Sequence, residues 1–92
     1  MSITVAVGND DDFNLSNGAV FDLFNHLGIT LTGTEGEFTG ADIQERMSKF
    51  TPSEAQKTAY YARYGVDLLE VLKWLRELVD RATEQNLPIQ LF

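Results

Sequence analysis

The chain contains no cysteine, one histidine and one tryptophan among its 92 residues. Without cysteine it can form neither a disulfide nor a thiolate metal site, and it has no cysteine nucleophile. A small domain without disulfides is typical of a reducing compartment, so we expect a cytoplasmic protein. No apolar run approaches the roughly 20 residues that a membrane-spanning helix needs. The N-terminus lacks the basic start of a secretory signal.

Basic residues are missing from the first half of the chain. Residues 1–45 hold eight acids and no Lys or Arg, whereas residues 46–92 hold seven bases and six acids, so the formal charges are −8 and +1. The eight acids are Asp10, Asp11, Asp12, Asp22, Glu35, Glu37, Asp42 and Glu45. Phosphate contacts need clustered Lys and Arg, so we expect no direct binding to nucleic acid or to an anionic membrane. A basic partner protein is compatible with this block, and so is the simpler view that acidic loops keep a small protein soluble.

The remaining composition is typical of one globular domain spanning residues 1–92, with 43% hydrophobic and 11% aromatic residues. The strongest pattern is in Val66–Gln85, where apolar residues recur at steps of three and four opposite a charged face. This spacing predicts a long amphipathic helix with a broad apolar side, around which the fold is built. If that side exceeds what one chain covers, residues 66–86 would form a homodimer or a groove for a partner.

Local signals predict the other elements. Strands are expected at Ile3–Val7 and at Ile89–Phe92, and they should pair because lone strands are unstable. A helix should cover residues 17–27 after an N-cap at Ser16 or Asn17. Further helices are predicted at 40–49, capped by Thr39, and at 52–64, capped by Thr51 with Pro52 in the first turn.

Two short segments complete the expectation. Gly8–Asn14 is predicted to be a polar loop, and Ile29–Thr32 a brief strand that joins the sheet. The fold class is therefore α+β, mostly helical, with about four helices and a small sheet formed by the N- and C-terminal strands. The predicted core comprises Val5, Val7, Val20, Phe21, Phe24, Leu27, Ile43, Met47, Leu68, Leu72, Trp74, Leu75, Val79 and Leu91.

Part of the sequence resembles a known group of proteins. The stretch Asn14–Leu27 (NLSNGAVFDLFNHL), followed by Gly28 and by Gly36-Glu37-Phe38, is similar to a group of small uncharacterised bacterial proteins. Their shared features are an Asn/Ser-rich helix start, a Leu-Gly helix end, a Gly-Glu step, a long C-terminal helix and a short terminal strand. The resemblance covers most of the chain and implies a bacterial origin and the α+β order of elements. It implies no activity and no functional residues.

Few residues have the arrangement of a chemical site. Asp22 and His26 are spaced i,i+4 and could pair as half of a general-base arrangement, or form an ordinary surface pair near a helix end. The run Asp10–Asp12 with Asn14 and Ser16 resembles a calcium loop only weakly, because the required Gly and Glu positions are not met. No zinc spacing and no phosphate-binding glycine loop is present, so no metal or cofactor is expected.

These observations favour a non-enzymatic protein-interaction or regulatory module that presents an acidic N-terminal surface to a protein partner. The alternatives are an acidic inhibitor that imitates nucleic acid, of the phage or mobile-element anti-defence type, and a small enzyme using His26 and Asp22. Among the clustered tyrosines, Tyr60 and Tyr64 share a helix face and at least one should be buried, whereas Tyr61 and Arg63 should be exposed. The expected binding residues are Asp10, Asp11, Asp12, Asp22, Glu35, Glu37, Tyr61 and Arg63.

Overall fold

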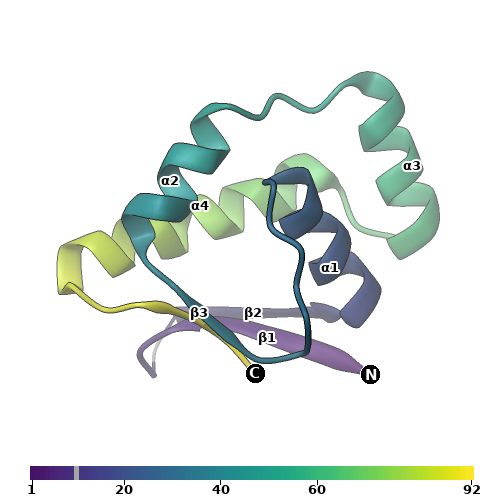
Figure 1. Cartoon of the computed structure of the whole chain (residues 1–92). Coiled ribbons are helices and arrows are strands. Elements are labelled where there is room, and N and C mark those ends of the chain that lie inside the picture. The colour runs from purple at the N-terminus through teal and green to yellow at the C-terminus, as the bar shows by residue number, and fades with distance from the viewer. Residues whose placement is uncertain (10) are drawn as a thin grey trace.

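A computed structural model describes residues 1–9 and 11–92. The order of elements is β1 (Ser2–Val7), β2 (Asp11–Ser16), α1 (Asn17–His26), β3 (Gly36–Phe38), α2 (Gly40–Ser48), α3 (Glu54–Tyr64), α4 (Leu68–Gln85) and β4 (Ile89–Leu91). The strands form one antiparallel sheet in the order β2-β1-β4-β3. All four of these helices lie on one side of the sheet, so the other side is left open (Figure 1). The predicted α+β class, with the two terminal strands in the sheet, is confirmed.

The core lies between the sheet and the helices. Alternate residues of β1 (Ile3, Val5 and Val7) point to the helical side and are at most 1% exposed. The long helix α4 faces them with a stripe of buried side chains, namely Leu68, Val71, Leu75, Leu78, Val79 and Ala82. Burying one such aliphatic side chain contributes about 1.5–3 kcal/mol. The apolar side chains that recur along α4 therefore account for a large part of the stabilisation by apolar burial.

The long helix begins later than its apolar pattern does. Gly65 ends α3 in the left-handed region, at φ 71°, and its N–H donates to the carbonyl of Tyr61. Asp67 then caps α4, its side chain accepting a hydrogen bond of 2.9 Å from the backbone N–H of Leu69. Gly65 thus separates two helices completely, because a side chain with a Cβ avoids this conformation and Gly does not.

The predicted loop at Gly8–Asn14 is wrong in its second half, because Asp11–Ser16 forms β2. This strand pairs with β1 along its whole length, with Val5 opposite Phe13 and Ile3 opposite Leu15. Asp and Asn have low intrinsic strand propensity, but the alternation of Phe13 and Leu15 places both on the helical side. Packing of Phe13 and Leu15 on that side therefore explains why the segment forms a strand. Asp10, also predicted in this loop, lies outside the described residues.

Two other local predictions are wrong. Ile29–Thr32 forms no strand, and the last position in the sheet is taken by Gly36–Phe38. The N-cap of α3 is Ser53 instead of Thr51, and a capping box joins Ser53 to Gln56 in both directions. Both starts contain a hydroxyl residue with a polar residue three positions later, so the local pattern alone could not separate them.

The predicted core is largely correct, with three exceptions. Phe21 is 38% exposed, and Leu72 and Trp74 are only partly buried. Phe21 lies on the outward side of α1, whereas Leu23 and Phe24 face inward. Trp74 packs against Phe13 of β2, with ring centroids 5.8 Å apart, at the margin of the core.

Candidate binding surface: the open face of the sheet

One row of residues crosses the open face of the sheet. Asp12 lies opposite Ala6, Ala6 opposite Gln90, and Gln90 opposite Glu37. Neighbouring strands are about 4.8 Å apart, so the backbones of Asp12 and Glu37 are separated by roughly 14 Å. Both acids are exposed, and their side chains point away from the helices because their strand neighbours face the core. This row of residues, which we call the strip, therefore has a carboxylate at each end.

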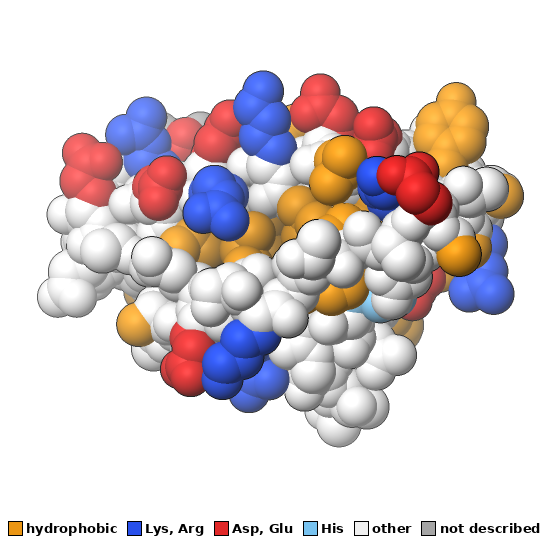
Figure 2. Space-filling view, turned by 90° about the horizontal axis from the view of Figure 1, so that it is seen from above, with side chains coloured by type: hydrophobic (Ala, Val, Ile, Leu, Met, Phe, Trp, Pro, Cys, Tyr) orange, Lys and Arg blue, Asp and Glu red, His pale blue; other side chains and the backbone are white. Residues whose placement is uncertain are grey.

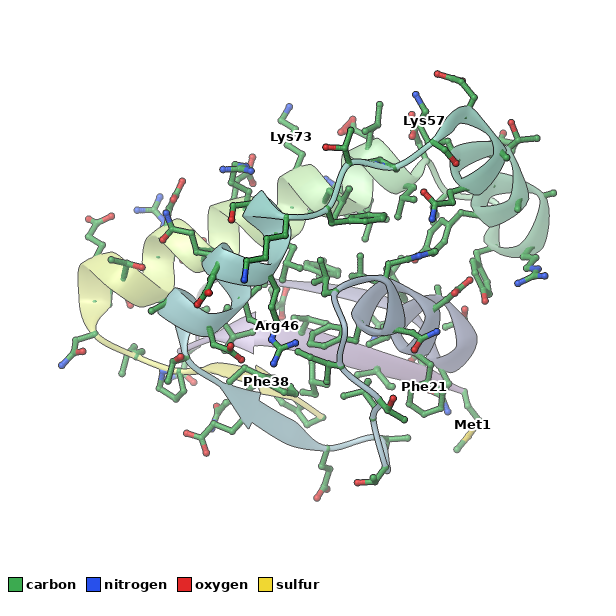
Figure 3. The ribbon with its side chains drawn as sticks, turned by 45° about the horizontal axis from the view of Figure 1, so that its top comes forward. Met1, Phe21, Phe38, Arg46, Lys57 and Lys73 are labelled. Atoms are coloured by element: carbon green, nitrogen blue, oxygen red, sulfur yellow. The ribbon has the colours of Figure 1, made fainter. Side chains whose placement is uncertain are left out.

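The two layers of the molecule differ in charge. The sequences of β1, β2, β3 and β4 contain no Lys or Arg. The seven bases all belong to the helical layer, where Lys57 and Lys73 point away from the sheet (Figure 3). Consequently no basic side chain of a strand neutralises Asp12 or Glu37.

Acids that face the helical layer are paired with bases instead. Within the described residues, four ion pairs with Lys or Arg involve acids of the base-free half: Asp11 with Arg81 at 3.6 Å, Asp22 with Arg63 at 3.8 Å, Asp42 with Arg46 at 3.1 Å, and Glu45 with Lys49 at 3.1 Å. The acids of that half for which the described residues provide no such pair are Asp12, Glu35 and Glu37. Among the described residues, the acids of this half without a Lys or Arg partner therefore lie on the open face and in the exposed segment before β3.

Three predicted site residues meet on the helical side, around Asp22 of α1. Its carboxylate accepts a hydrogen bond of 3.1 Å from the hydroxyl of Tyr64, and lies 3.8 Å from Arg63 and 3.7 Å from His26. Tyr61 lies one turn before Tyr64 on α3, is 62% exposed and takes no part in this cluster. The contacts join α1 to α3, which indicates a structural role for Asp22.

The tyrosines of this region are held in their neutral form. Tyr60 is 1% exposed and donates a hydrogen bond of 2.8 Å to the carbonyl of Ala19. Burial raises the pKa of Tyr60 well above its ordinary value of 10. Partial burial also raises the pKa of Tyr64, and the hydrogen bond to Asp22 adds to this effect. Neither hydroxyl is therefore suited to act as a base at neutral pH.

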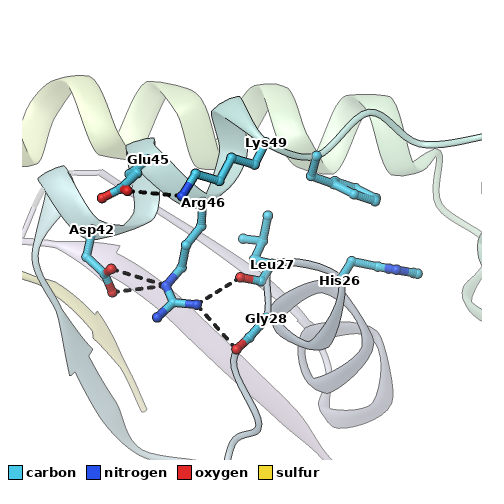
Figure 4. Close-up of a pocket in the computed structure, with 8 residues that line it drawn as sticks. His26, Leu27, Gly28, Asp42, Glu45, Arg46 and Lys49 are labelled. Carbon is cyan, nitrogen blue, oxygen red and sulfur yellow. Dashed lines mark hydrogen bonds and ion pairs between the residues drawn. The ribbon is translucent and has the colours of Figure 1, made fainter.

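His26 borders a pocket between α1 and α2 (Figure 4). Its ring stacks on Phe50, with centroids 5.2 Å apart. The pocket lining includes no Ser, Thr, Tyr or Cys that could serve as a nucleophile. Arg46 spans it and donates to the carbonyls of Leu27 and Gly28 at 3.1 and 3.3 Å, as well as to Asp42. Its cation stabilises the end of α1, where backbone carbonyls lack helical partners.

The described residues offer little support for a metal site. They contain no cluster of three or more His, Asp or Glu side chains suited to a metal ion. Asp11 and Asp12 follow one another in β2, so their side chains point to opposite faces and cannot share one calcium ion. Among the same residues, no helix is both long and apolar enough to cross a membrane.

The helical face carries an apolar hollow surrounded by mixed charges (Figure 2). Met47, Phe50, Leu69 and Leu72 line it, beside Lys73 and Arg76. Only Leu69, at 49%, is strongly exposed among these apolar residues. The wide apolar side of α4 is therefore mostly covered by the chain itself.

No family model, curated protein or solved structure matches the chain. The resemblance to small bacterial proteins stays an expectation, and function must be inferred from the surface of the chain. Sequence reasoning missed the edge strand β2 and its aromatic contact with Trp74. The alternation of Phe13 and Leu15 with the polar residues Asp12, Asn14 and Ser16 is the signal that would have indicated this strand.

Proposed function

We propose that this protein is a non-enzymatic interaction module that binds a basic partner protein through the open face of its sheet. The observation that carries the proposal is the row from Asp12 to Glu37 on the open face, which has an exposed acid at each end and no base on any strand. A cationic surface placed against this strip would gain contacts that the chain itself does not supply.

The expected affinity for the basic partner is modest, and it should depend strongly on salt concentration. An exposed ion pair contributes about 0.2–1 kcal/mol, so two carboxylates alone give weak binding. Their larger effect is on the choice of partner and on the association rate, which falls as salt shortens the Debye length. Gln90 lies between them, and Thr4 lies on the same face opposite Asn14; both provide further polar contacts.

The other candidates receive less support. Imitation of nucleic acid requires carboxylates spaced over one face, whereas Asp22, Asp42 and Glu45 lie in the helical layer beside bases. An enzyme using His26 and Asp22 would need a nucleophile or a second acid–base group. The carboxylates that line the pocket beside His26 are Asp42 and Glu45, and they pair with Arg46 and Lys49. A homodimer through residues 66–86 would have to bury Leu69 and Leu72, which form only a small apolar area.

The test compares two double charge reversals with the same net charge. Asp12→Lys with Glu37→Lys changes the open face, and Glu70→Lys with Glu77→Lys changes exposed positions of α4. Titration calorimetry with a lysine-rich peptide should show about tenfold weaker binding for the first variant, because two favourable contacts become repulsive. The second should stay near the wild-type affinity. Equal weakening by both variants would mean that only net charge matters, and the proposal would then be wrong.

A further inference from the structure

The outer edge of β2 carries backbone groups without partners in the chain. Thr4 exchanges both of its backbone hydrogen bonds with Phe92, at 2.6 and 2.9 Å, so its N–H and C=O point toward β4. In an antiparallel strand these directions alternate, which directs the groups of Ile3, Val5 and Val7 toward β2. Their partners there are Leu15, Phe13 and Asp11.

It follows that the intervening residues of β2, Asp12 and Asn14, point their N–H and C=O groups away from β1. No strand of the described chain pairs with this side, because β2 is the last strand of the sheet. The strand is six residues long and contains no proline. An edge of this length with four free backbone groups is a template for a further strand.

Side chains along this edge specify which strand would fit. On the helical side lie Phe13 and Trp74, both only partly buried and 5.8 Å apart. On the open side lie Asp12 and Asn14, and the strand contains no base. A segment that alternates apolar and basic residues would cover the two aromatic rings with one side and meet Asp12 with the other.

We propose that the partner supplies an extended segment of alternating apolar and basic residues, which adds to the edge of β2 as a fifth strand. This inference rests on the proposed function, since it names how the basic partner is held. A second copy of β2 is a poorer occupant, because each copy would bring its own Asp12 to a strand that contains no base.

The probe is a capped peptide of alternating Lys and Val with the length of β2, six residues. The matched control peptide has the same composition with its lysines and valines in two blocks. Trp74 is the only tryptophan and lies beside the edge, so its fluorescence reports occupation directly. The alternating peptide should bind saturably with a change in Trp74 emission, about tenfold more tightly than the block peptide.

Asn14→Pro removes the outward N–H, while proline is tolerated on an edge strand. Asn14→Thr is its control, because it keeps the N–H and likewise loses the side-chain hydrogen bond from Asn14 to Thr4. The proline variant should bind the alternating peptide about tenfold more weakly than the threonine variant. In the wild-type chain the amides of Asp12 and Asn14 should exchange quickly with solvent and become protected on binding. This measurement decides the question even if the proline variant fails to fold.

Equal affinity of the two peptides, with equal affinity of the two Asn14 variants, would overturn the fifth strand while leaving a purely electrostatic module intact. A dimeric free chain whose Asp12 and Asn14 amides are already protected would also overturn it, because a second copy would then occupy the edge. If neither peptide binds, the fifth strand and the proposed function both fail.

Discussion

Tyr60→Phe tests how the buried hydroxyl of α3 contributes to stability. The substitution keeps the ring, which packs edge-on against Tyr64 with centroids 4.7 Å apart, and removes only the 2.8 Å hydrogen bond to Ala19. A hydrogen bond of this kind contributes about 1 kcal/mol net. At neutral pH we therefore expect the free energy of unfolding to fall by about 1 kcal/mol.

The same substitution should have the opposite effect in alkali. Burial raises the pKa of Tyr60 in the folded state above its value of about 10 in the unfolded chain. As the pH rises past 10, the unfolded chain therefore loses the Tyr60 proton first, and the wild type loses about 1.4 kcal/mol per pH unit from this group. The phenylalanine variant lacks this loss, while Tyr64 and the lysines remain in both proteins. The two stability curves should cross roughly one unit above pH 10, where the lost 1.4 kcal/mol exceeds the hydrogen bond.

Urea denaturation at a series of pH values from neutral to strongly alkaline measures both effects. The expected result is a wild type that is more stable at pH 7 and less stable above the crossing. Parallel curves for the two proteins through the alkaline range would refute the reasoning, because Tyr60 would then ionise equally well in the folded and unfolded states.

The remaining predictions concern two helix ends. Gly65→Ala should lower the free energy of unfolding by about 1 kcal/mol in thermal or urea unfolding, because φ 71° is unfavourable for alanine. Gly33→Ala is the control and should be nearly neutral, since its Cβ would meet no atom within 4 Å. Equal effects of the two substitutions would show that backbone strain is not the cause. Arg46→Met should cost about 1–2 kcal/mol by removing the bonds to the carbonyls at the end of α1, and Lys49→Met, whose side chain is 73% exposed, less than about 0.5 kcal/mol. A larger loss for Lys49→Met than for Arg46→Met would contradict the capping role of Arg46.

Helix predictions succeeded where the signals were short-range. The cap at Thr39 was predicted and is confirmed, and of the two candidates Ser16 and Asn17 the structure selects Ser16; the two side chains accept hydrogen bonds from the backbone N–H groups of Asp42 and Ala19. The predicted cap at Thr51 is wrong, because Ser53, which was not predicted as the cap, satisfies the same local rule. For β2 the strand propensities of the individual residues were misleading, because its acids and Asn14 disfavour a strand. Pairing with β1 and contact with α4 stabilise the strand nevertheless.

The candidate site was predictable in composition but not in position. The absence of bases from residues 1–45 drew attention to the acids. The helix positions predicted that Tyr61 is exposed and that at least one of Tyr60 and Tyr64 is buried, and the buried one is Tyr60. Which acids stay unpaired was not predictable. Asp11 is neutralised by Arg81, a residue 70 positions later, while its neighbour Asp12 faces the open side.

By itself, the sequence determined the long helix and the terminal strands, because periodicity and caps act over a few residues. Only the tertiary structure decided that β2 is a strand and that it forms an edge. It also decided that all bases lie in the helical layer while Asp12 and Glu37 lie on the open face. The physical reason is that pairing and charge neutralisation join residues far apart in the chain, and each strand sends successive side chains to opposite faces.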